Sequence, residues 1–228
     1  VELDTLRFGL SRRHKRVRLA LSKAINREAI VSRVMEGVAI PAGQLLDASF
    51  FGTSKTIKPV AHDPEGAKKL LAEAGFPNGF KLTLHGPNGR YTNDVKIAEA
   101  VAQMFSRVGI ETNIETLPPA VFFTRASTGA AGQPEFSFIL VGWGSDTGET
   151  SSPLKSLLGT FDKDKGTGTA NRGRYANPAL DKLVADALAT VDDAKRQDLL
   201  AKASELAMDD VGLIPSHYQI NTWATKKG

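Results

Sequence analysis

Apolar residues recur every three or four positions along much of the chain, which is the spacing of one helix face. The first stripe predicts a helix and consists of Val17, Ala20, Leu21, Ala24 and Ile25. Comparable stripes predict further helices within residues 26–37, 63–75, 93–109, 177–188 and 199–207. Asn26, Asp63 and Asn177 precede three of these stripes, and Asn and Asp are preferred helix caps. A shorter helix is expected to begin at Pro118-Pro119, and another lies near residues 154–158.

Two segments alternate between apolar and polar residues, which is the spacing of a strand. They are residues 80–85 and 110–117, and a predicted helix separates them. A strand, a helix and a strand in this order form a βαβ unit, whose right-handed crossover makes the strands parallel. The apolar run 136–142 predicts a third, buried strand and a second crossover, and residues 213–223 predict a closing strand. The expected fold is therefore α/β, with a mixed, partly parallel sheet flanked by helices, in one domain over residues 1–228.

Composition limits the chemistry available to the chain. It has 228 residues, of which 41% are apolar and 24% charged, so it can form a folded core. It contains no Cys, which excludes disulfides and thiol catalysis, and its net charge of +4 is too small to indicate nucleic-acid binding. No apolar run reaches the ~18–20 residues of a membrane helix. The four His residues lack metal-binding spacing, and neither a nucleophile elbow nor a phosphate-binding loop occurs, so we expect no cofactor or metal.

Ligands of open α/β sheets bind beyond the carboxyl ends of the parallel strands, so the loops at 86–92 and 143–152 are the candidate site. The first loop offers Asn88, Arg90 and Tyr91. The second offers Trp143, which could cover an apolar group, and the carboxylates Asp146 and Glu149, which could pair with an ammonium group. The spacing allows an equally ordinary alternative, in which Trp143 anchors the core and Asp146 caps the short helix that follows.

Two further functions compete with solute binding. Asp146 and Glu149 could act as the acid and base of a hydrolase or transferase. The basic run at residues 12–18 could instead bind an anionic surface, although its apolar neighbours favour the solvated start of a helix.

Several segments together resemble one family, the extracellular solute-binding proteins of oligopeptide and dipeptide ABC importers (family 5). The matching segments occur in the family's order over nearly the whole chain: 17–30, 62–75, Gly-Trp-Gly-Ser-Asp at 142–146, Tyr-Ala-Asn-Pro-Ala-Leu-Asp at 175–181 and Ile-Pro-Ser-His-Tyr at 214–218. Members have two lobes, and these segments belong to the C-terminal lobe. The resemblance therefore implies that this chain is one lobe of a longer protein. Residues 1–14 and 222–228 would be connecting segments to an N-terminal lobe that is missing here.

The resemblance also implies a function and a set of residues. It implies an exported periplasmic or extracellular protein, not an enzyme, that holds a peptide or small solute between its lobes and delivers it to a membrane permease. In peptide-binding relatives the Asp of the Trp-x-x-Asp segment pairs with the peptide's amino terminus, and that position is Asp146 here. Relatives often continue this segment with Tyr-x-x-Pro, whereas this chain continues with Thr147 and reaches a proline only at Pro153. A Gly-rich loop through Asn171 and Arg174 resembles a branch that contains glutathione- and peptide-type binders. Both residues join the candidate set.

Overall fold

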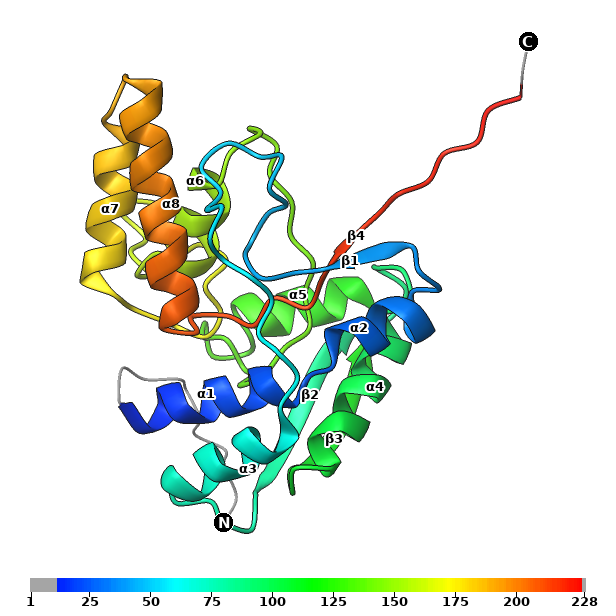
Figure 1. Cartoon of the computed structure of the whole chain (residues 1–228). Helices are drawn as coiled ribbons and strands as arrows, with labels where there is room; N and C mark the ends of the chain where they lie inside the picture. The colour runs from blue at the N-terminus through cyan, green and yellow to red at the C-terminus, as the bar shows by residue number, and fades with distance from the viewer. Residues whose placement is uncertain (1–11, 227–228) are drawn as a thin grey trace.

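A parallel βαβ unit lies at the lower right of the computed structural model in Figure 1, which describes residues 12–226. Strand β2 (Lys81–Pro87) leads through helix α4 (Asp94–Ser106) to strand β3 (Glu111–Leu117). The two strands pair in parallel from Lys81 opposite Glu111 to Pro87 opposite Leu117. This confirms the α/β class and the first predicted crossover.

The antiparallel pairing lies in a separate two-stranded sheet. Strand β1 (Ala39–Pro41) pairs with β4 (His217–Gln219), and Ile40 stands opposite Tyr218. The predicted closing strand is thus only three residues long, and its partner β1 is equally short. Parallel and antiparallel strands therefore occur in this fold without sharing one mixed sheet.

The predicted third strand at 136–142 is wrong in its length and its burial. The segment pairs with β2 only around His85, whose N–H donates to Phe138 O at 3.0 Å and whose carbonyl accepts from Leu140 N at 2.8 Å. The next residue of β2 that faces this segment is Pro87, which has no N–H to donate. The parallel ladder ends there, and Phe136 is the buried residue of the run.

Helices from the first half of the chain cover the βαβ unit. They are α1 (Arg12–Ala24), α2 (Arg27–Ala29), which continues into the π-helical turn η1 (Ile30–Val34), and α3 (Pro64–Glu73). The Asn26 and Asp63 side chains accept hydrogen bonds from the first turns of α2 and α3, as their positions predict. The predicted stripe of α1 is buried and packs with α3, α4, β2 and β3 in the larger hydrophobic cluster.

A second hydrophobic cluster lies around the helical hairpin of α7 (Pro178–Leu188) and α8 (Asp193–Asp209), which stand side by side in Figure 1. The Asn177 side chain caps α7 as predicted. The short helix α6 (Ser151–Pro153) and its continuation η2 (Leu154–Leu158) pack against this hairpin. Helix α5 (Pro119–Ser127) contributes Phe122 to a third, smaller cluster with Phe136.

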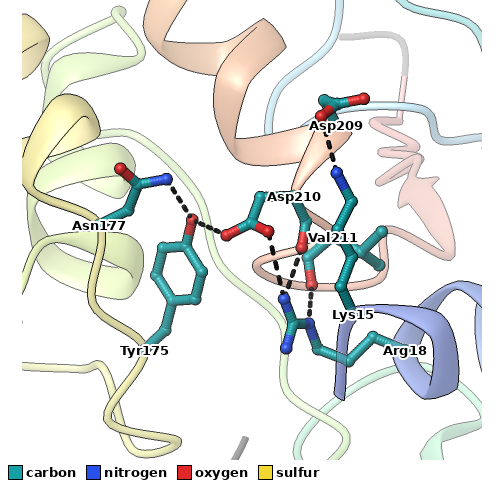
Figure 2. A network of polar contacts seen from close by, with 7 residues as sticks. All are labelled: Lys15, Arg18, Tyr175, Asn177, Asp209, Asp210 and Val211. Carbon is teal, nitrogen blue, oxygen red and sulfur yellow. Dashed lines mark hydrogen bonds and ion pairs between the residues drawn. The ribbon is translucent and has the colours of Figure 1, made fainter. Parts of the chain in front are cut away.

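A polar network joins the two larger clusters (Figure 2). Arg18 of α1 is 6% exposed and donates to the carbonyls of Asp210 and Val211, at 2.6 and 2.8 Å, just beyond the end of α8. The Tyr175 hydroxyl donates to the carboxylate of Asp210 at 2.7 Å and accepts from the Asn177 amide at 3.2 Å. Burial, and to a lesser extent the hydrogen bond to Asp210, raise the pKa of Tyr175, so its hydroxyl remains a donor at neutral pH.

The basic run at 12–18 forms the first turns of α1, as the helical interpretation predicts. Its described basic side chains all pair with carboxylates: Lys15 with Asp209 at 2.8 Å, Arg16 with Glu73 at 3.8 Å, and Arg18 with Asp210 at 3.5 Å. These contacts do not favour a free anion-binding arm. The expected connecting segment 1–14 lies largely outside the described residues, and 222–226 follow β4 without regular structure. Within residues 12–226, no helix combines the length and apolar character needed to cross a membrane.

Candidate ligand-binding site

The loop after β2 is shaped by one carboxylate. Asp94, at the start of α4, accepts hydrogen bonds from the backbone N–H groups of Gly89, Arg90 and Tyr91, at 3.2, 2.9 and 3.1 Å. Burial disfavours the charged form of Asp94, but these bonds and one from Val95 together hold its pKa below the ordinary value. The turn that presents Arg90 and Tyr91 is thus fixed by a buried anion.

Tyr91 connects this loop to the segment that precedes Trp143. Its hydroxyl donates to Gly142 O at 3.1 Å, and its ring lies against the Gly142 Cα. A Cβ at position 142 would stand 2.7 Å from Tyr91 Cε1, so only glycine permits this approach. Arg90 places its guanidinium 5.5 Å from the centre of the Tyr91 ring.

The Trp143–Ser152 loop is held from both sides. Within the loop, Ser145 Oγ donates to Glu149 O at 2.7 Å and accepts from Glu149 N at 3.2 Å. The Glu149 carboxylate accepts from Ser151 Oγ and pairs with Arg196 of α8 through Nη2, at 2.5 and 2.7 Å. The backbone of Phe51 bonds to Gly148 O at 3.2 Å and to Thr150 N at 3.0 Å.

These two loops, the middle of α5 and the segment that carries Arg172 line an open pocket of about 330 Å³, within the usual size range of small-molecule sites. Its lining combines two guanidinium groups, one carboxylate and aromatic rings. The lining residues are Arg90, Tyr91, Phe123, Gly142, Trp143, Gly144, Asp146, Ser152 and Arg172.

Asp146 and Trp143 both face this pocket, and the structural alternative proposed for them is wrong. Trp143 is 44% exposed, so it does not anchor the core. The α6 helix begins at Ser151 with Thr150 at its N-cap, so Asp146 does not cap it. The exposed Asp146 carboxylate makes no hydrogen bond or ion pair with any residue in the described part of the chain.

Other residues of the predicted set do not line this pocket. Asn88 and Thr147 are exposed to solvent, and the Thr147 hydroxyl lies 3.2 Å from Ser145 Oγ. Asn171 is buried, and its side chain bonds to backbone atoms of Gly159 and Tyr175, so its role is structural. Arg174 stacks on Phe161, with 3.8 Å from its guanidinium carbon to the ring centre. Thr147, Asn171 and Arg174 make local contacts instead. Asn88 is exposed outside the pocket lining.

Sequence reasoning missed three lining side chains, Phe123, Ser152 and Arg172. Arg172 is half-buried: its Nε donates to Ser127 Oγ at 3.2 Å, and its guanidinium lies 5.4 Å from the centre of the Phe123 ring. Burial lowers the pKa of Arg172 from its ordinary value. The sequence signal that could have identified Arg172 is its position between Asn171 and Arg174, two residues of the predicted set.

The geometry does not support the hydrolase alternative. The Glu149 carboxylate is paired with Arg196, and Glu149 does not line the pocket that Asp146 faces. The two carboxylates therefore do not form an acid–base pair across a reacting bond. In residues 12–226 no group of three or more His, Cys, Asp or Glu side chains is placed to hold a metal ion.

The fold is that of one part of a two-lobed periplasmic binding protein. It superposes on the Helicobacter pylori periplasmic binding protein DppA in complex with the peptide STSA with a TM-score of 0.81, at 28% identity over 90% of this chain and 38% of that one. It also superposes on HbpA2 of Haemophilus parasuis with a TM-score of 0.81, at 26% identity over 91% and 40%.

The chain belongs to the bacterial extracellular solute-binding proteins, family 5, whose middle region matches residues 6–165. It is 32% identical to the periplasmic oligopeptide-binding protein OppA of Salmonella typhimurium over 92% of this chain, and 28% identical to the dipeptide-binding protein of Escherichia coli over 89%. The chain spans only 38% and 37% of the length of these two relatives.

Proposed function

We propose that this chain is one lobe of the solute receptor of an ABC importer, and that the complete protein binds peptides or peptide-like amines between two lobes. Family membership and the peptide-binding names of several relatives support this proposal. The partners would be a second lobe, supplied by the rest of the longer protein, and a membrane permease. The protein would work outside the cytoplasmic membrane and would break no bond.

The observation that carries the proposal is the Asp146 carboxylate, which has no partner among residues 12–226 and lines, together with Trp143, the pocket at the carboxyl end of β2. An ammonium group placed there would form a charge-assisted hydrogen bond. Closure of a second lobe would remove water from the pair and strengthen it. A hydrogen bond to a charged group contributes about 1.5–3 kcal/mol, or roughly 10- to 150-fold in affinity.

Calorimetry on the full-length protein tests this role. The probes are Ala-Ala and Ala-Phe with free and with N-acetylated amino termini. We expect Asp146→Asn to weaken binding of the free amines by 10-fold or more and to leave the acetylated forms unchanged. Asp164→Asn, which changes another exposed carboxylate outside the pocket, is the matched control. Equal affinity for free and acetylated peptides in the wild-type protein would remove Asp146 from this role.

A further inference from the structure

Strand β3 has backbone groups on its outer side that bond to nothing in the described part of the chain. Its first residue, Glu111, donates its N–H to Phe80 O at 3.0 Å, on the side of β2. In a parallel ladder every second residue bonds to the same neighbour, so the odd-numbered residues of β3 face β2. The even-numbered residues direct their N–H and C=O groups outward, without a hydrogen-bond partner among residues 12–226: Thr112, Ile114 and Thr116.

This edge lacks the features that usually prevent a free strand from pairing with another one. The segment Glu111–Leu117 contains neither Pro nor Lys, and its register with β2 runs without a bulge. Its two carboxylates are already paired inside the chain. Glu111 contacts Lys81 at 3.0 Å, and Glu115 contacts Arg125 at 2.9 Å. The edge therefore carries little unbalanced charge that would repel an incoming strand.

The outward backbone groups of β3 are complementary to those of a second β3. When two such strands run antiparallel and are centred on Ile114, Thr112 of one copy stands opposite Thr116 of the other, and Ile114 stands opposite Ile114. Every outward N–H and C=O of both strands then has a partner. A slip of two residues in either direction leaves one outward residue of each strand unpaired, so the centred register is the most favourable one.

The side chains of the intervening residues fit the same register. Asn113 stands opposite Glu115 of the second copy, and Glu111 stands opposite Leu117, so no two like charges oppose each other directly. These are the pairs that do not share backbone hydrogen bonds, in which side chains approach most closely. The exposed Asn113 amide can donate to the carboxylate of Glu115, which binds Arg125 through its other oxygen side.

We propose that β3 is a pairing edge whose occupant is a second copy of this protein, bound antiparallel with Ile114 at the two-fold axis. The sheets of the two copies then form one continuous sheet across the axis. An edge of seven residues buries less surface than an obligate interface, so the dimer forms reversibly. This proposal goes beyond solute binding and does not depend on it.

Analytical ultracentrifugation of the full-length protein, from about 5 to about 500 μM, measures the dissociation constant of the dimer. Variants at the exposed Asn113 test the register. Asn113→Glu places a carboxylate opposite Glu115 of the second copy, and Asn113→Lys places an ammonium group there. Ala194→Glu, which adds the same charge at an exposed position of α8, is the matched control for Asn113→Glu. Circular dichroism confirms that each variant is folded.

We expect the wild-type protein to dimerise within this range of concentration. Asn113→Glu should raise the dissociation constant by about 2- to 30-fold, because the change occurs in two symmetry-related cross-strand pairs. Asn113→Lys should lower it, and Ala194→Glu should leave it unchanged. Thr112→Pro should abolish the dimer, because it removes an outward N–H that the ladder with β2 does not use.

Amide hydrogen exchange, followed by NMR, distinguishes a second copy from other occupants of the edge. Protection of the Thr112, Ile114 and Thr116 amides that rises with protein concentration supports the inference. Protection of the same amides at the lowest concentration means that the longer protein covers its own edge, and this overturns the inference. A protein that remains monomeric throughout, or a dimer that responds equally to both charges at Asn113, also overturns it.

Discussion

Replacing Arg18 with Met tests whether the polar network of Figure 2 holds the two larger hydrophobic clusters together. Arg18 donates to two carbonyls at 2.6 and 2.8 Å, and each bond from a charged donor contributes about 2 kcal/mol. The contact with the Asp210 carboxylate, at 3.5 Å, adds little. The buried Nη1 of Arg18 has no hydrogen-bond partner, at a cost of about 2 kcal/mol that Met removes. The expected net loss is therefore about 2 kcal/mol in the free energy of unfolding.

Urea titration at pH 7, followed by circular dichroism, measures this loss. Arg16→Met is the matched control on the same helix, because Arg16 is half-exposed and its contact with Glu73 is 3.8 Å long. We expect the control to change stability by less than about 0.5 kcal/mol. Combining Arg18→Met with Tyr175→Phe should give an effect that differs from the sum by about 1 kcal/mol, since both side chains contact Asp210. A loss for Arg18→Met no larger than the control's would refute the reasoning.

Three further predictions concern the backbone, the loop and pH. Val211 follows the end of α8 with φ +51°, where a β-branched residue is strained, so Val211→Gly should be more stable in urea than Val211→Ala by about 1 kcal/mol; equal stability would contradict this. Glu149→Gln should loosen the loop from Arg196, lowering the fluorescence anisotropy of Trp143 in a Trp223→Phe background, whereas Asp164→Asn should not. Because the pKa of Asp94 is lowered in the folded state, its stabilisation should be complete above its unfolded pKa of about 3.9 and be lost as pH falls through the folded value. Asp94→Asn should therefore flatten the loss of stability below about pH 4, and an unchanged acid slope would count against the assignment.

The elements that could be predicted from sequence are those whose periodicity and end signals agree. Helices α1, α3 and α7 each have an apolar stripe, and α3 and α7 also have a capping side chain. All three form where expected. The run at 136–142 carried the apolar content of a buried strand. Its pairing depends on which residue of β2 stands opposite, and a missing N–H on Pro87 cannot be recognised until that register is known.

The sequence indicated the two loops that line the pocket, but not which of their neighbouring side chains face it. The rule for strand ends pointed to two loops, and Trp143, Asp146, Arg90 and Tyr91 from these loops line one pocket. Neighbouring side chains point in different directions in irregular backbone, so proximity in sequence did not separate Arg172 from Arg174. Such backbone has no fixed period from which a direction can be calculated.

The residues that hold the two loops in place are different from the carboxylate that faces the pocket, and this affects how the pocket can change. Asp94, Tyr91 and Glu149 shape the two loops, whereas the carboxylate of Asp146 supports no other part of the described chain. Substitutions at Asp146 should therefore cost little folding free energy. Selection, or a protein engineer building a sensor, could therefore exchange the group proposed to bind the solute while the two loops keep their structure.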